Sequence, residues 1–121
     1  MAVIRPFFSI RPSEEKADKI AALPYDVYNR EEALKEVERE PLSFLAIDRA
    51  ETQFDSSVDT YADCVYDKAR ELLDSRIADG TFITDTDKAY YVYELTMNGR
   101  TQTGIAACAS IDDYNNNIIK K

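Results

Sequence analysis

Tyr25 and Asp26 are the residues of this chain whose types and setting best suit ligand binding. They lie in a short proline loop, residues 23–27, between two expected helices, and Pro24 keeps Leu23 out of the α region. A loop fixed at both ends presents backbone N–H groups and a carboxylate in defined positions. In the more ordinary alternative, Asp26 forms a hydrogen bond within the turn and Tyr25 packs against the protein.

Two further positions carry charges that could contact an anionic or polar ligand. Asp48-Arg49 follows an apolar run, and the Arg49 guanidinium could bind an anionic group, although a surface ion pair is the commoner outcome. Arg100 begins a polar stretch beside a hairpin turn, where exposed tips are usually polar in any case. The candidate ligand-binding residues are therefore Tyr25, Asp26, Asp48, Arg49 and Arg100.

Adjacent acidic residues could do acid–base chemistry or hold Mg²⁺. Two of the three pairs, Glu14-Glu15 and Glu31-Glu32, fall in expected first helical turns, where the helix dipole explains them. Asp112-Asp113 is at a strand end beside Tyr114 and is the acidic pair best placed for a cation or substrate contact. The chain has no histidine, and the spacing of its three glycines matches no phosphate-binding loop. No metal site and no nucleophile–histidine pair is expected.

Composition favours a folded acidic domain. The 121 residues carry 15 Lys and Arg against 23 Asp and Glu, a net charge of −8. An acidic surface repels phosphate backbones, so direct nucleic-acid binding is not expected. No apolar run approaches the roughly 20 residues of a membrane span, and the N-terminus lacks a signal-peptide pattern, so the protein is predicted to be cytoplasmic. Cys108, among alanines, is predicted to be a small core residue.

The periodicities predict a single α/β (α+β) domain with a mixed sheet of about four to five strands, three helices and a long C-terminal β-hairpin. Asn29 and Glu32 form a capping-box pattern, and Gly80 suits the end of the longest helix. The expected elements are strand 3–10, helix 14–22 capped by Ser13, helix 30–39, a buried strand 42–48, a structureless loop 51–59, a helix from 59 or 60 to 79, and a brief strand 81–84.

The hairpin spans residues 90–111. Asn98-Gly99 lies between two runs rich in aromatic and β-branched residues, and both residues tolerate the positive φ of a type I′ turn. A two-residue loop would pair Met97 with Arg100, Leu95 with Gln102 and Tyr93 with Gly104. A three-residue loop with a glycine bulge would shift this register by one.

A set of short motifs is spread over the whole chain, at residues 4–7, 11–12, 23–27, 40–45, 48–51, 98–104 and 110–114. Together these motifs resemble the DUF1015 family, a widespread prokaryotic family of unknown function whose members are sometimes labelled sporulation or chromosome-partition regulators. Members are usually longer, so the resemblance implies an N-terminal domain of a larger protein. Ala46 stands where many members have histidine, which removes any role of that histidine here.

The family is in turn remotely similar to the ParB/sulfiredoxin-like group, which contains nucleotide-binding partition proteins and a free-serine kinase. That likeness implies a small-molecule or nucleotide ligand, a nucleotide cofactor in the full-length protein and possible phosphotransfer. Tyr25 and Asp26 would line the pocket, with Asp48, Arg49 and Arg100 as weaker candidates. The alternative is a non-catalytic regulatory module that acts through protein contacts. Ligand, reaction and oligomeric state stay open.

Overall fold

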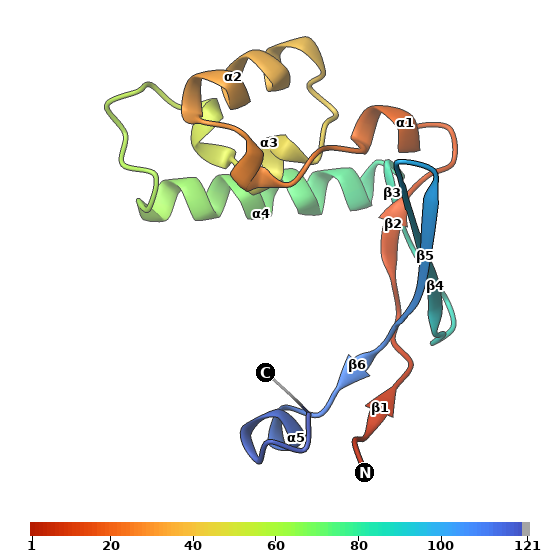
Figure 1. Cartoon of the computed structure of the whole chain (residues 1–121). Helices are drawn as coiled ribbons and strands as arrows, with labels where there is room; N and C mark the ends of the chain where they lie inside the picture. The colour runs from red at the N-terminus through yellow and green to blue at the C-terminus, as the bar shows by residue number, and fades with distance from the viewer. Residues whose placement is uncertain (120–121) are drawn as a thin grey trace. The chain divides into compact units, whose positions relative to one another are not determined.

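The computed structural model describes residues 1–119, and these residues divide into two compact units (Figure 1). Unit 1 combines residues 1–10 with the segment from Thr84 onward, and unit 2 is the continuous segment Arg11–Ile83. Strands β2 (Ile10–Pro12) and β3 (Phe82–Thr84) pair with each other, and the division falls within both strands. The two units are described separately below.

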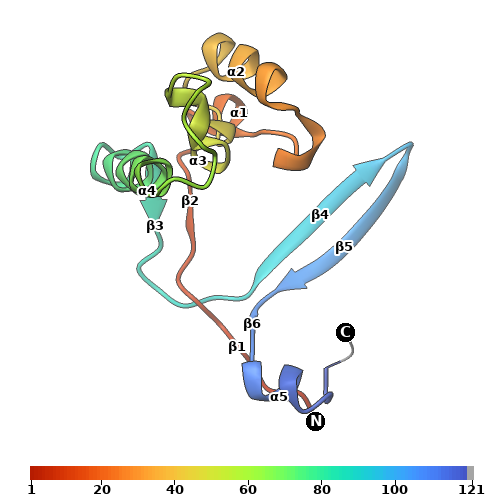
Figure 2. The ribbon, with the colours of Figure 1, turned by 90° about the vertical axis from the view of Figure 1, so that its left-hand side faces the viewer.

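Unit 2 is mainly helical. Helix α3 contacts both α2 and α4 and lies between them in Figures 1 and 2. The core consists of Ala33 and Val37 from α2 and Leu45 and Ala46 from α3, with Tyr28 and Leu72 packed against them. The helical elements are α1 (Ala17–Ile20), the 3-10 turn η1 (Tyr25–Val27), α2 (Arg30–Arg39), α3 (Leu45–Asp48), the 3-10 turn η2 (Ala50–Gln53) and α4 (Asp63–Ala78).

The predicted capping box of α2 is confirmed. The Asn29 side chain accepts a hydrogen bond from the Glu32 amide at 2.9 Å, and the Glu32 carboxylate accepts one from the Asn29 amide at 2.9 Å. These two bonds satisfy backbone donors that a helix leaves without intrahelical partners. Helix α2 therefore begins at Arg30 as predicted.

The predicted buried strand 42–48 is wrong, because this segment forms a turn and then α3. Leu45 and Ala46 are fully buried against α2, and the Arg49 amide donates to the Leu45 carbonyl at 2.8 Å. A short apolar run does not distinguish a strand from a buried helical turn, so tertiary packing decided between them.

Three other boundaries differ from the prediction. Helix α1 begins at Ala17, and Ser13 does not cap it: the Ser13 carbonyl accepts from the Lys16 amide, which forms a separate turn. Helix α4 begins at Asp63, because Asp59 uses its carboxylate to bind the Tyr61 amide at 2.7 Å in a local turn. The expected loop 51–59 begins with η2, where Glu51 is 2% exposed.

Arg76 of α4 is a buried arginine that binds the backbone between α2 and α3. Its side chain is 6% exposed and donates to the carbonyls of Pro41 at 2.8 Å, Leu42 at 3.0 Å and Ser43 at 3.3 Å. Burial lowers the pKa of the Arg76 guanidinium, although arginine stays charged at any physiological pH. The arginine thus fixes the irregular backbone between α2 and α3.

Unit 1 contains a long β-ribbon, formed by β4 (Tyr91–Met97), β5 (Arg100–Ala106) and the turn between them. Met97 pairs with Arg100, Leu95 with Gln102 and Tyr93 with Gly104, which is the register of the two-residue loop. Asn98 and Gly99 have φ of 52° and 74°, as a type I′ turn requires.

The rest of unit 1 is short. β1 (Ile4–Arg5) pairs antiparallel with β6 (Cys108–Ala109), and α5 (Ile111–Asn115) follows, capped by the Ser110 hydroxyl. The prediction that Cys108 is buried is wrong: its thiol side chain is exposed, because β6 pairs with β1 in a narrow two-stranded sheet.

The α+β class is confirmed, but the described strands form three two-stranded sheets where one mixed sheet was predicted. Five short or medium α-helices occur among residues 1–119 where three were expected. Within this described part, no helix is both long enough and apolar enough to cross a membrane.

Candidate functional site

The proline loop of unit 2 is exposed, as its proposed role requires. The Val27 amide donates to the Pro24 carbonyl at 3.0 Å and closes the single turn of η1. Tyr25, Val27 and Leu23 are each more than half exposed. Asp26 is exposed, and its carboxylate makes no hydrogen bond or ion pair to the residues that the structure describes. The turn-bond alternative for Asp26 therefore has no support in the geometry.

Arg49 anchors the proline loop through hydrogen bonds to backbone carbonyls. Its Nη1 donates to the carbonyls of Tyr28 at 2.7 Å and Tyr25 at 3.2 Å, and its Nε donates to the Glu51 Oε1 at 2.6 Å. The Arg49 side chain is 17% exposed and the Glu51 side chain is 2% exposed, so this is a buried ion pair. Arg49 thus neutralises Glu51 and positions the loop.

The other predicted site residues make none of these hydrogen bonds. Asp48, the last residue of α3, is exposed, and partial burial of its carboxyl raises the pKa above the ordinary value. Arg100 begins β5 in unit 1 and is exposed. Asp113 of the third acidic pair accepts from the Val3 amide at 2.7 Å, which ties the N-terminus to α5.

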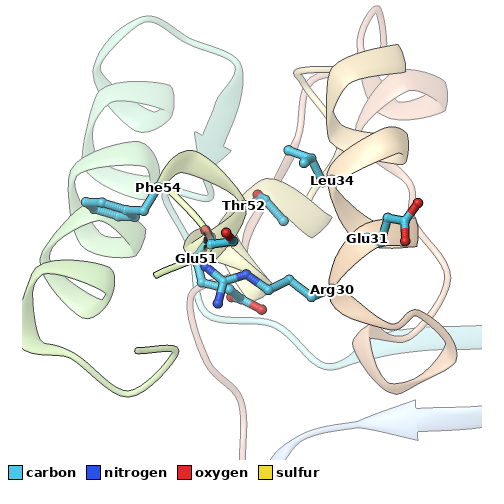
Figure 3. Close-up of a pocket in the computed structure, with 7 residues that line it drawn as sticks. Arg30, Glu31, Leu34, Glu51, Thr52 and Phe54 are labelled. Atoms are coloured by element: carbon cyan, nitrogen blue, oxygen red, sulfur yellow. Dashed lines mark hydrogen bonds between the residues drawn. The ribbon is translucent and has the colours of Figure 1, made fainter. Parts of the chain in front are cut away.

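A pocket of about 260 Å³ opens on unit 2 beside the buried ion pair (Figure 3). Figure 3 shows Leu34 and Phe54 on opposite sides of Thr52, with the Arg30 side chain extending from α2 towards Glu51. The pocket therefore combines apolar walls with one cation. Its lining residues are Arg30, Glu31, Leu34, Glu51, Thr52, Phe54 and Ser56.

Arg30 is the cation of this pocket. It donates through Nη1 to the Val58 carbonyl at 3.1 Å and through Nη2 to the Asp55 carbonyl at 3.1 Å, with a longer contact of 3.5 Å to the Glu51 carbonyl. Among the described residues, no ion pair within 4 Å links its guanidinium to a carboxylate. The positive charge is thus held in place by neutral acceptors.

Sequence reasoning missed the pocket because its residues come from the start of α2 and from a segment expected to have no structure. One signal was available: Phe54 is a large aromatic residue in an otherwise polar stretch. Arg30 directly follows the capping residue Asn29, which fixes its position at the first turn of α2.

Comparison with known protein families gives a match over nearly the whole chain. The family model described as "Protein of unknown function (DUF1015)" matches residues 4–121. No curated protein and no solved structure is significantly similar to this chain.

Proposed function

This chain belongs to the DUF1015 family, and we propose that its unit 2 binds a small organic ligand in the pocket that Arg30 and Phe54 line. The observation that carries the proposal is an arginine held by backbone carbonyls, with no carboxylate of the described residues within 4 Å, at the wall of an apolar concavity. Pockets of this kind, with apolar walls and a few fixed polar groups, are the usual setting for small-molecule binding.

The size of the pocket limits the ligand. Drug-sized ligands occupy pockets of roughly 300–1,000 Å³, and this pocket measures about 260 Å³. A compound with one ring or an amino-acid-sized skeleton fits this volume better than a whole nucleotide. Leu34 and Phe54 would contact the apolar part, and Arg30 would contact a carboxylate or another acceptor group.

The charge of the chain acts against an anionic ligand at long range. The net charge is −8, but exposed charges are largely screened beyond about 8–10 Å at ordinary salt. Arg30 lies at the pocket wall and is held by three backbone carbonyls, so its position is fixed. The lining also carries Glu31 and Glu51, and Arg49 pairs with Glu51. Added salt screens the repulsion between an anionic ligand and the acidic surface, so binding should strengthen as salt rises to moderate concentration.

Benzoate is the first probe, with benzamide as its neutral analogue, followed by serine, ADP and ATP. Amide NMR shifts report where each compound binds. We expect saturable shifts around Arg30 and Phe54 with benzoate and weaker ones with benzamide. If none of the five probes causes saturable shifts of the amide signals of the pocket residues, the proposal is refuted.

Leu34→Ser tests the pocket without disturbing the core, because Leu34 is 39% exposed. It should weaken benzoate binding about tenfold, the equivalent of roughly 1.4 kcal/mol. Leu23→Ser is the matched control, since Leu23 lies in the same unit, is 58% exposed and does not line the pocket. Equal effects of the two substitutions would contradict the assignment.

Nucleotide binding by a larger ParB-like protein stays a prediction. The exposed loop of Tyr25 and Asp26 would then contribute one wall of a site that the full-length protein completes. Titration of the full-length protein with ATP and ADP tests this possibility, with Asp26→Asn as the variant. Unchanged binding in that variant would exclude the loop from the nucleotide site.

A second candidate function is a non-catalytic module that binds another protein. It is favoured by the ribbon of unit 1, where Tyr93 is 60% exposed and Met97 is 75% exposed on the same face. Exposed apolar patches of this kind often mark interaction surfaces. A photoreactive crosslinking group at Met97 should form a covalent adduct with the partner protein efficiently. The same group at Thr96, on the opposite face, should not.

A further inference from the structure

Among the described residues, the β4–β5 ribbon has no third strand beside it, and large apolar side chains on both of its faces are exposed. Within the part of the chain that the structure describes, β4 and β5 pair only with each other (Figure 2). Large apolar side chains are exposed on both faces, with Leu95 and Met97 on one and Val92 and Ile105 on the other. A two-stranded ribbon alone is marginally stable in water, and a third strand or a packed face stabilises it.

The register fixes which backbone groups of the ribbon point outward. Met97 and Arg100 flank the two-residue turn, so they exchange both backbone hydrogen bonds, and the pairs then alternate along the ribbon. The Thr96 and Thr101 hydroxyls are 2.9 Å apart, as expected of a pair that does not exchange backbone bonds, where side chains lie closer. The outer edge of β5 therefore presents the N–H and C=O groups of Thr101, Thr103 and Ile105.

The two edges of the ribbon differ in charge. The corresponding groups on β4 are those of Val92, Glu94 and Thr96, so pairing β4 with its own copy would place Glu94 opposite Glu94. Like charges directly opposite are destabilising. The β5 edge groups belong to two threonines and an isoleucine and carry no charge.

We propose that a second copy of this chain pairs along the β5 edge, antiparallel and centred on Thr103, to form a four-stranded sheet. Thr103 then lies opposite Thr103 of the second copy, and Thr101 lies opposite Ile105. About six backbone hydrogen bonds form, and threonine pairs and β-branched pairs are favourable across strands. On the other face of the sheet, Gln102 meets Gly104 without a clash.

Charge supports a second copy as the partner. The chain has a net charge of −8, but between Tyr91 and Ala106 the only charged residues are Glu94 and Arg100, which cancel. Two ribbons therefore approach without local repulsion, while the rest of each chain repels the other at a distance. Self-association should strengthen as added salt screens that repulsion. It does not require ligand binding in unit 2.

Sedimentation of the whole chain tests the proposal. Wild type should dimerise as its concentration rises towards about 1 mM, a weak association of roughly 4 kcal/mol. Thr103→Lys and Thr103→Glu should each weaken dimerisation about tenfold, since each places like charges opposite one another. An equimolar mixture of the two variants should restore the dimer. Thr96→Lys, on the β4 edge, is the matched control and should behave as wild type.

Wild type that stays monomeric throughout would overturn the proposal, as would an equal effect of Thr96→Lys and Thr103→Lys. A mixture that fails to recover while both variants keep the wild-type circular dichroism would also overturn it. Amide exchange of wild type gives a measurement without substitutions: the Thr103 and Ile105 amides should become protected as concentration rises. The Glu94 amide should not.

Discussion

Replacing Arg49 with methionine tests the central interaction of unit 2. The substitution keeps an unbranched apolar stem but removes the hydrogen bonds to the Tyr25 and Tyr28 carbonyls and the ion pair with Glu51. Glu51 is 2% exposed, so its carboxylate would stay buried without a counter-ion. Breaking a buried pair in this way costs about 3–5 kcal/mol.

That loss is large against the roughly 5–15 kcal/mol that stabilises a typical domain. Because m-values of small proteins are about 1–3 kcal/mol/M in urea, the unfolding midpoint should fall by about 2 M. The chain has no tryptophan and 8 tyrosines, so far-ultraviolet circular dichroism and tyrosine fluorescence are suitable probes. Arg70→Met is the matched control, since the Arg70 side chain is 83% exposed and its substitution should barely move the midpoint.

A double substitution separates the buried charge from the lost hydrogen bonds. Adding Glu51→Gln to Arg49→Met removes the unpaired carboxylate, so the double variant should be more stable than Arg49→Met alone. The reasoning is refuted if Arg49→Met loses less than about 1 kcal/mol, or if the double variant is no more stable than the single one.

Three further substitutions have defined outcomes. Arg76→Met removes a donor from the carbonyls of residues 41–43, of which the Ser43 carbonyl still accepts from the Ala46 amide, and should destabilise the protein by about 3 kcal/mol in urea unfolding. Gly99→Ala places a Cβ at φ of 74° and should cost about 1 kcal/mol, seen as faster amide exchange in the ribbon. Hydrogen bonds from the Thr81 side chain and, as a smaller cause, from the Thr81 amide lower the pKa of the Asp79 carboxyl below its ordinary value. The carboxylate therefore contributes stability above its unfolded-state pKa, and this contribution is lost as pH falls through the lowered pKa. Asp79→Asn should therefore flatten the acid side of the plot of melting temperature against pH, and an unchanged acid slope would contradict this.

Local signals in the sequence predicted local structure well. The capping box at Asn29 and the register around Asn98 and Gly99 depend on residues within a few positions of one another, and the structure has both. The helix at Leu45 and the burial of Glu51 depend on packing against α2 and on Arg49, and no local pattern carries that information.

The candidate site also has one part that local sequence predicted and another that depends on tertiary packing. The proline loop is exposed because Pro24 and a single backbone bond shape it locally. Its support by Arg49 joins residues 24 positions apart, and the pocket joins the start of α2 to Phe54, so both required the folded structure. The prediction that Arg49 binds a ligand stays untested, although its geometry favours a supporting role.

Because the chain is synthesised from its N-terminus, the two units can fold at different stages of synthesis. Residues 11–83 are continuous, so unit 2 is complete before β4 has been made. Residues 1–10 are made before unit 2, but β1 pairs only once β6, more than 100 residues later, has been made. A ribosome-bound nascent chain stalled when β3 has just left the exit tunnel should therefore already resist proteolysis between α1 and α4 while residues 1–10 are still cut.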